Sequence, residues 1–239
     1  MKSITDTSIR KAGLVAGLAI LIMAIAAGFS VGYVNESLIV AGDALTSFEN
    51  IRNSLSLFRA GILGWLIILI CDVLAAWGLY VWLKNVNPHL SLLTAWLRLI
   101  YTTILGIALL NYLVVLLMLS SDSYQAMMPV DQLSAQMMLL LQAFESMWSL
   151  GLIIFGGHLL SLGYLLSQSR SVPKVWSILI LIAGIGYILI HLSKLILPQF
   201  ETYHSIVEMI FILPMILGEL GLGIYLIIKA AKNNLSTHE

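Results

Sequence analysis

Cysteine and charge are what this sequence has least of. Its 239 residues include one cysteine, Cys71, which excludes an internal disulfide framework and a CxxC metal or redox motif. Only 10% of the residues are charged, compared with about 25% in an ordinary soluble domain. The 12 basic and 12 acidic residues cancel and form no basic patch, so we expect no nucleic acid partner.

Sequence motifs of several common enzyme classes are also missing. The chain contains no Walker A loop, no nucleophile elbow, no dinucleotide fingerprint and no HExxH pair. We therefore predict no cofactor. The missing motifs do not decide whether the protein is an enzyme of another kind.

Long apolar runs fill the sequence instead. Hydrophobic residues make up 60% of the chain, and a bilayer core requires runs of about 20 such residues. We predict an all-α, polytopic membrane protein, a bundle of six transmembrane helices with short loops that forms one integral membrane domain over 1–239. The predicted spans are roughly 12–34, 57–83, 91–119, 146–167, 175–197 and 206–229.

Two loops carry helix-start signals. Asp43 is a good N-cap residue for a short helix from Ala44 to about Asn53. Pro129 and Asp131 indicate the start of another helix. We expect that second helix either to run on into the fourth span or to lie on the outer membrane surface.

Lysine and arginine predict the orientation, because cytoplasmic loops of membrane proteins carry an excess of these residues. Six spans with both termini in the cytoplasm satisfy this rule, with Arg52 as an exception. We therefore expect a multi-pass membrane protein with both termini in the cytoplasm and the lipid bilayer as its surroundings. The cytoplasmic basic residues are Lys2, Arg10, Lys11, Lys84, Arg170, Lys174, Lys229 and Lys232, and the outer acids are Glu36, Asp43, Glu49, Asp122, Asp131 and Glu201.

Four ionisable residues lie inside predicted spans. Asp72, Arg98, His158 and Glu219 occupy four different helices. Counted from the cytoplasmic helix ends, their depths agree within roughly 6 Å at a rise of about 1.5 Å per residue. Charged side chains inside a membrane are rare and usually face the protein interior. We call these four residues the polar layer.

Several interpretations of the polar layer stay open. In one, Asp72 pairs with Arg98 and the layer only fixes helix packing. In another, carboxylates and a histidine form a proton relay or an ion-coupled binding site. Asp72, His158 and Glu219 are also candidate metal ligands, since nitrogen and oxygen ligands suit zinc. General acid–base chemistry on a lipid-like substrate is a further interpretation.

A second group of charged residues lies nearer the outer membrane face, where such residues form boundary ion pairs or a site open to the outside. Small residues at 13 and 17, and at 157 and 161, predict close helix contacts within one chain or between copies. A monomer and a small homo-oligomer both fit this pattern. The outer-face residues are Glu145, His191, Lys194 and Glu208.

Seven short stretches resemble a known family. In order along the chain they are RKAGLVAGL at 10–18, SLIVAGDA at 37–44, SLFRAGI at 56–62, DVLAAWGLY at 72–80, FGGHLLSLGYLL at 155–166, VPK at 172–174 and LIAGIGYI at 181–188.

Their order and spacing are similar to the bacterial multi-pass membrane family known as domain of unknown function 4386. The resemblance implies a compact integral protein of the bacterial inner membrane and supplies no reaction. It directs attention to Asp43, Arg59, Asp72, His158 and Tyr164. The stretch after Pro198 matches poorly, so Glu208 and Glu219 have no support from the family.

The functional expectation is therefore broad. We expect a transporter- or sensor-like protein that binds a small molecule, ion or lipid at the polar layer, with Tyr164 as a further binding candidate. One alternative is an intramembrane enzyme, metal-dependent or not, that uses His158 with Asp72 or Glu219. The other is a structural or accessory membrane subunit.

Overall fold

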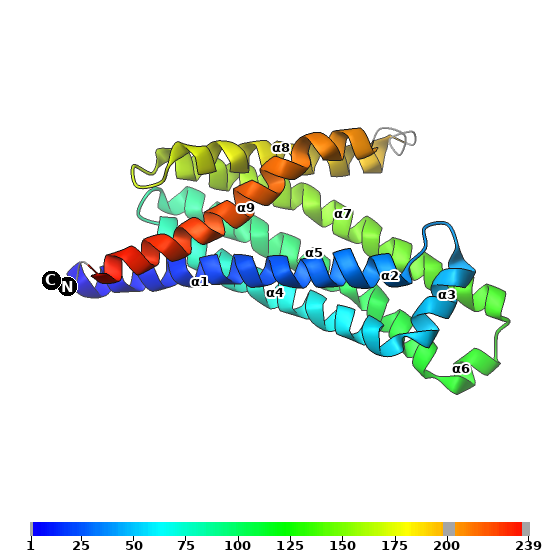
Figure 1. Cartoon of the computed structure of the whole chain (residues 1–239). Helices are drawn as coiled ribbons and strands as arrows, with labels where there is room; N and C mark the ends of the chain where they lie inside the picture. Colours follow the sequence, from blue (N-terminus) through cyan, green and yellow to red (C-terminus); the bar gives the residue numbers. More distant parts are fainter. Residues whose placement is uncertain (1, 198–203, 236–239) are drawn as a thin grey trace. The chain divides into compact units, whose positions relative to one another are not determined.

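The computed structural model describes residues 2–197 and 204–235, with side chains from residue 8 onward except at 122, 123, 204–206 and 233–235. All regular elements in these ranges are helical, which confirms the all-α class. Glu201 lies outside the described residues. The elements in Figure 1 are α1 (Lys2–Phe29), the π-helical η1 (Ser30–Asn35), α2 (Glu36–Leu38), α3 (Ala44–Asn53), α4 (Leu55–Leu83), α5 (Pro88–Ser120), α6 (Asp122–Ala126), α7 (Val130–Gln168), α8 (Lys174–Ile196) and α9 (His204–Leu235).

Six helices in the described ranges are long and apolar enough to cross a membrane, as predicted. The first, Ser8–Leu38, continues from α1 through η1 and α2. The shortest, α8, has 23 residues and is about 35 Å long, close to the roughly 30 Å of a bilayer core. The six-span membrane protein predicted from the apolar runs is therefore confirmed.

Helix α7 is much longer than the predicted span of 146–167. It begins at Val130, directly after Pro129, and continues without interruption to Gln168. No proline or glycine occurs between Val130 and Leu150, so nothing stops the helix although several residues there are polar. The predicted helix start at Pro129 is confirmed, and so is the alternative in which this helix runs on into the fourth span. The short helix α6 was not predicted.

Helix α3 forms where its N-cap predicts it. The Asp43 carboxylate accepts the backbone N–H of Thr46 at 2.9 Å and the Thr46 hydroxyl at 2.7 Å. These bonds stabilise the ionised form, so the pKa of Asp43 lies below its usual 3.8, mainly because of the Thr46 amide. Gly42 precedes the cap with a φ of 76°, a left-handed conformation that favours glycine.

The helices pack into two compact units, described separately below. Unit 1 comprises Met1–Ile22, Ile70–Thr102 and Leu150–Glu239, and unit 2 comprises Met23–Leu69 and Thr103–Ser149. Helices α1, α4, α5 and α7 each contribute residues to both units. The single domain over 1–239 stays a prediction.

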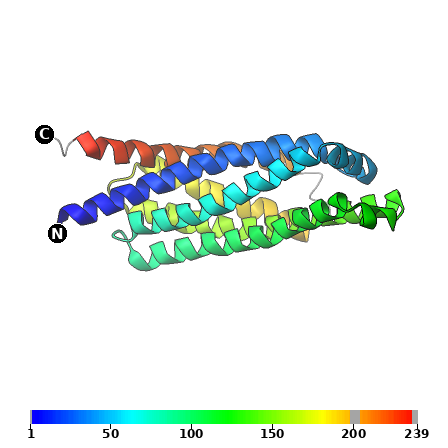
Figure 2. The ribbon, with the colours of Figure 1, turned by 90° about the horizontal axis from the view of Figure 1, so that it is seen from below.

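Close approaches at glycines join helices within unit 1. A Cβ added to Gly17 of α1 would lie 2.6 Å from the carbonyl oxygen of Gly223 in α9, where the two helices run side by side (Figure 2). A Cβ on Gly156 of α7 would lie 2.8 Å from the carbonyl oxygen of Gly184 in α8. A Cβ on Gly157 would meet no described atom within 4 Å. Within the described chain the close α7 contact therefore belongs to Gly156 and not to Gly157, whereas a contact between copies at Gly157 stays a prediction.

Unit 2 has an aromatic core. Trp65 lies edge-on to Phe144 and to Trp148, with ring centroids 5.0 Å apart in both pairs. Tyr112 lies 4.1 Å from Phe144 and 5.3 Å from Phe58. Such aromatic pairs bury large apolar areas and favour these tilted geometries.

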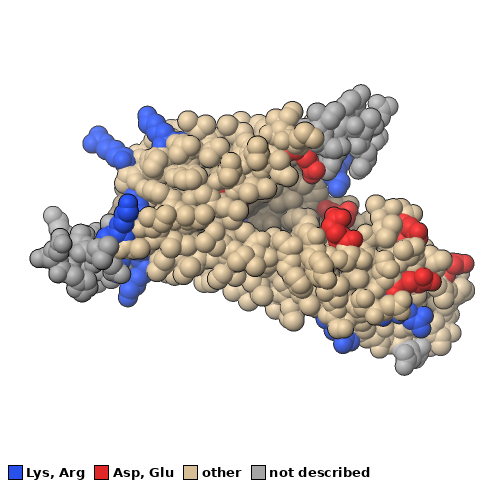
Figure 3. All heavy atoms as spheres, in the orientation of Figure 1, with Lys and Arg blue, Asp and Glu red and all other residues tan. Residues whose placement is uncertain are grey.

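Charged side chains differ in sign between the units. In unit 1, most of the described Lys and Arg side chains gather around the first part of α1, the last part of α9 and the α4–α5 and α7–α8 loops (Figure 3). In unit 2, acidic side chains are prominent around α3 and the start of α7 (Figure 3). This distribution agrees with the residues used to predict the orientation, which itself stays a prediction.

Candidate functional site

The centre of the candidate site is an ion pair between α4 and α5 in unit 1. Arg98 Nη2 lies 2.7 Å from Asp72 Oδ1, and Arg98 Nε donates to the same oxygen at 2.9 Å. Asp72 is 0% exposed and Arg98 is 1% exposed. Asp72 Oδ2 has no hydrogen-bond partner among the described residues.

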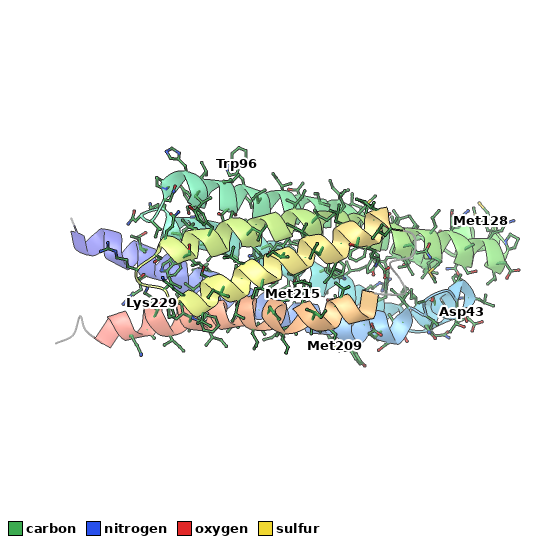
Figure 4. All side chains as sticks on the ribbon, turned by 90° about the horizontal axis from the view of Figure 1, so that it is seen from above. Asp43, Trp96, Met128, Met209, Met215 and Lys229 are labelled. Carbon is green, nitrogen blue, oxygen red and sulfur yellow. The ribbon has the colours of Figure 1, made fainter. Side chains whose placement is uncertain are left out.

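The two faces of α5 explain how Arg98 becomes buried in an apolar helix. Trp96, two residues earlier, is 61% exposed and points outward (Figure 4). Thr94 and Thr102 flank Arg98 at a spacing of four residues and are also buried. The polar side chains of this part of α5 therefore share one inward face, as the sequence predicted.

His158 of α7 completes the cluster as a neutral imidazole. Its Nε2 lies 3.2 Å from Arg98 Nη1 and its Nδ1 lies 2.8 Å from the carbonyl oxygen of Thr94. A guanidinium only donates and a carbonyl only accepts. Nε2 must therefore be the acceptor, and Nδ1 carries the proton.

Hydroxyl groups support this arrangement. Thr94 Oγ1 lies 3.0 Å from Ser161 Oγ, which joins α5 to α7 beside the histidine. Ser161 donates to the carbonyl of His158 at 2.8 Å, and Thr102 donates to the carbonyl of Arg98 at 2.8 Å. His158 and Ser161 therefore lie on the same face of α7, toward Thr94 of α5.

Phe155 connects the ion-pair cluster to a second polar contact. Its ring centroid lies 5.3 Å from the Arg98 guanidinium carbon and 5.4 Å from the His158 ring. The same ring lies 4.8 Å from Tyr101 and 5.3 Å, edge-on, from Tyr187 of α8. An aromatic face next to a guanidinium stabilises its charge by a cation–π interaction.

Glu219 of α9 forms the second polar contact. The Tyr187 hydroxyl donates to Glu219 Oε1 at 3.2 Å. Tyr187 in turn packs edge-on against Phe155, the ring next to Arg98. Arg98 therefore contacts both Asp72 and His158 directly, and Glu219 is connected to this cluster through Tyr187 and Phe155.

The geometry bears on the metal-ligand candidates Asp72, His158 and Glu219. No three His, Cys, Asp or Glu side chains in the described part of the chain are grouped so that they could hold a metal ion. Both ring nitrogens of His158 already have protein partners, so it has no lone pair left for a metal. As arranged, these residues do not fit a metal site.

Tyr164 lies away from the cluster. It is 57% exposed, because a residue six positions after His158 is rotated by about 120° around the helix axis and leaves the inward face. Tyr187 and Phe155, by contrast, belong to the site and were not predicted. Their only signal was aromatic character within an apolar run, which does not distinguish them from lipid-facing rings.

The outer-face candidates do not form a single group. Asp43 is the cap of α3, and Arg59 Nη2 donates to Ser120 Oγ at 3.4 Å. The His191 ring stacks on Tyr187 with centroids 6.1 Å apart, one helical turn from the Glu219 contact. The side chains of Glu145, Lys194 and Glu208 are exposed.

A separate polar contact fixes the α7–α8 loop to α9. Lys229, labelled in Figure 4, donates to the carbonyl oxygen of Ser171 at 2.9 Å. Its ammonium lies 5.4 Å from the Trp82 ring and 5.5 Å from the Tyr225 ring. The Tyr225 hydroxyl donates to the same carbonyl. The sequence placed Lys229 at a cytoplasmic helix end and did not predict this contact.

Comparisons with known proteins give a family and no activity. The family model "Domain of unknown function (DUF4386)" matches residues 15–230. An uncharacterized protein of Archaeoglobus fulgidus is 33% identical over 128 residues, which are 54% of this chain and 63% of that relative. The chain thus spans less than two thirds of the relative it matches. No solved structure matches the chain.

Proposed function

The chain belongs to the DUF4386 family, and we propose that it is a transporter- or sensor-like membrane protein in which proton binding at the polar layer is linked to binding of a small molecule, ion or lipid. The observation that carries this proposal is the one-sided bonding of Asp72. Both Arg98 bonds end on Oδ1, and Oδ2 has no described partner. Oδ2 can therefore take a proton, or a hydrogen bond from a ligand, while Oδ1 keeps its bonds to Arg98.

Glu219 supports the same proposal. A carboxyl group in hydrogen-bond contact with Tyr187, whose ring packs against Phe155 beside Arg98, is a second place for a proton. With His158 neutral, the charge of the layer depends on whether Asp72 and Glu219 carry protons. Intramembrane carboxylates and histidines of this kind mark proton and ion pathways in other membrane proteins.

Proton movement in reconstituted liposomes tests the proposal. The full chain would be reconstituted with a pH-sensitive dye inside the vesicles, and a potassium diffusion potential would be imposed. We expect proton flux that Glu219→Gln reduces about tenfold or more, equivalent to about 1.4 kcal/mol. Glu49→Gln, which changes an exposed acid of α3, is the matched control and keeps the flux. Equal flux in both variants would contradict a transporter role for the layer.

One observation favours a structural or accessory role as the second candidate. The Asp72–Arg98 bonds are direct and buried, and they tie α4 to α5 beside α7. A cluster of this kind fixes helix packing without any ligand. This candidate predicts that neither carboxyl changes its protonation while the fold is intact.

We further propose that the protein lies in a bacterial inner membrane with both termini in the cytoplasm. The Lys and Arg at the termini, the α4–α5 loop and the α7–α8 loop support this orientation. Cysteines introduced at Lys84, which is partly exposed, and at Glu49, which is exposed, give the test. In intact cells, an impermeant thiol reagent should label position 49 and not position 84.

A further inference from the structure

A group of basic side chains at one end of unit 1 has no role in the proton-linked proposal. They come from the first part of α1, the α4–α5 loop, the α7–α8 region and the last part of α9, which gather at one end of unit 1 (Figure 3). They are scattered along the sequence, which is why no basic patch was predicted from it. We call this surface the basic end, and its members are Lys11, Lys84, Arg170, Lys174, Lys229 and Lys232.

Direct contacts around Lys229 join these segments to one another. Lys229 of α9 donates to the carbonyl oxygen of Ser171 in the α7–α8 loop at 2.9 Å. Its ammonium lies 5.4 Å from the ring of Trp82, near the end of α4. A Cβ added to Gly13 of α1 would lie 3.0 Å from the same ring. Parts of α1, α4, α9 and the α7–α8 loop therefore meet at one place, all within unit 1.

The other basic residues lie within three positions of these contact residues in the sequence. Arg170 and Lys174 are on either side of Ser171 and are exposed, as are Lys11 and Lys232. Lys84 is partly exposed. The basic end therefore presents several accessible cations on one surface.

Acidic side chains do not balance these cations. Those described in unit 1 are Asp72, Glu208 and Glu219. Each lies ten or more residues before the nearest member of the basic end on its own segment, which is about 15 Å or more along a helix. The charge of the basic end is therefore available to a negatively charged partner.

Exposed apolar side chains begin directly beside these charges. Val175 and Ile178 of α8 are 52% and 55% exposed, and Ile228 of α9 is 49% exposed. Val175 follows Lys174, and Ile228 precedes Lys229. A partner that covers both kinds of surface must carry negative charge next to apolar chains.

Helix α8 gives the membrane level of the basic end. It lies wholly in unit 1 and is about 35 Å long, close to the roughly 30 Å of a bilayer core. With α8 across the bilayer, Lys174 at its first residue lies at the level of the lipid headgroups. Clusters of Lys and Arg next to membrane spans attract anionic lipids.

We propose that the basic end binds anionic phospholipid, with Arg170 and Lys174 at the phosphate and the acyl chains along the exposed apolar side of α8. An acidic protein would satisfy the cations but would not cover Val175 and Ile178 within the membrane, so the lipid is the partner that fits both. The site shares no residue with the polar layer and does not depend on the proton-linked function.

Competition between two lipids tests the proposal. The full chain would be delipidated in detergent, mixed with equal amounts of phosphatidylglycerol and phosphatidylcholine that have the same acyl chains, and weighed by native mass spectrometry. We expect the wild type to retain phosphatidylglycerol in about tenfold excess. Arg170→Gln combined with Lys174→Gln should lower this preference about fivefold or more, because each basic residue contributes separately to the attraction.

Two control variants separate local charge from net charge and from structure. Arg52→Gln combined with Lys194→Gln removes one Arg and one Lys, both exposed and outside the basic end, and should keep the preference. Arg170→Lys combined with Lys174→Arg keeps both charges and should also keep it. The proposal is overturned if the wild type retains both lipids equally, which would favour an acidic protein as partner, or if the two Gln pairs behave alike.

Tryptophan fluorescence in vesicles provides a second test that needs no charge variant. Trp82 lies beside Lys229, and its signal is the difference between the wild type and Trp82→Phe. Brominated phosphatidylglycerol in phosphatidylcholine vesicles should quench this signal more than brominated phosphatidylcholine does at the same mole fraction. About 0.5 M NaCl should remove most of the difference, because salt screens exposed charges. Equal quenching by the two lipids at low salt would contradict the proposal.

Discussion

Arg98 donates two hydrogen bonds to Asp72, and both end on the same carboxylate oxygen. A fork-to-fork pair would instead use both oxygens. Here Oδ2 is buried and has no described partner, while the remaining guanidinium nitrogen, Nη1, faces His158. The pair thus holds α4 and α5 together, and Oδ2 of Asp72 is still available to accept a hydrogen bond or a proton. Asp72 can therefore serve both in helix packing and in proton binding.

Replacing Asp72 and replacing Arg98 should destabilise the protein by different amounts. Asp72→Asn leaves a buried guanidinium that cannot lose its proton, whereas Arg98→Gln leaves a carboxylate that can become neutral by binding one. We expect Asp72→Asn to cost about 3–5 kcal/mol and Arg98→Gln to cost less. Thermal unfolding of both variants in the same detergent checks the order.

The double variant measures the coupling between the two residues. If the pair is a direct interaction, Asp72→Asn with Arg98→Gln should be more stable than the sum of the single effects predicts, by about 1–3 kcal/mol. Additive effects would contradict the direct contact between Oδ1 and the guanidinium.

His158 should be neutral with its proton on Nδ1. Its Nε2 accepts from Arg98, and its Nδ1 donates to the Thr94 carbonyl. The ¹⁵N shifts of a histidine-labelled sample, assigned with His158→Gln, distinguish the two tautomers and the imidazolium. Observation of the Nε2-protonated tautomer, or of a charged ring at neutral pH, would show that the arrangement is wrong.

Two neighbouring glycines of α7 should respond differently to alanine. Gly156→Ala places a Cβ 2.8 Å from the Gly184 carbonyl oxygen, so α7 and α8 must move apart at a cost of about 1–3 kcal/mol. Gly157→Ala meets no described atom within 4 Å and should be neutral or slightly stabilising, because alanine favours helix more than glycine does. Thermal unfolding of the two variants provides the comparison, and equal losses would contradict the predicted contact.

The cap of α3 should weaken in acid. The pKa of Asp43 is below 3.8 in the folded chain, so the stabilisation from its ionised form is present above about pH 4 and is lost as the pH falls through the lowered value. Hydrogen-exchange protection of the α3 amides, corrected for the intrinsic pH dependence, should fall in this range in the wild type. In Asp43→Asn, which keeps an acceptor without a titrating charge, the protection should not change with pH.

The sequence predicted most of the fold because the bilayer imposes a length on every span. Runs such as 175–197 correspond closely to α8, and the Asp43 cap marks α3. The predicted start of the fourth span was too late, because polar residues between 130 and 145 resemble a loop although nothing there breaks a helix. The sequence does not distinguish Gly156 from Gly157 as the contact position, because neighbouring glycines differ in direction by about 100° and spacing alone does not fix the rotation of a helix.

The site could be predicted only in part, for a related reason. Ionisable residues are easy to recognise in apolar spans. Their similar depths then predict that Asp72, Arg98, His158 and Glu219 form one layer. Contacts made by ordinary aromatic residues, such as Phe155, have no such signal. The bonding of His158 to a backbone carbonyl depends on atomic positions that composition and spacing do not specify.

Infrared spectroscopy of the full chain in lipid bilayers, recorded as a function of pH, tests the central claim most directly. A protonated carboxyl has a C=O stretch that is separate from the bands of a carboxylate, so each buried acid can be followed by subtracting the spectrum of its amide variant. We predict that the wild type gains one such band that is missing in Asp72→Asn and another that is missing in Glu219→Gln, while the fold is intact. If neither variant lacks a band that the folded wild type shows, Asp72 and Glu219 do not exchange protons, and the polar layer only fixes helix packing.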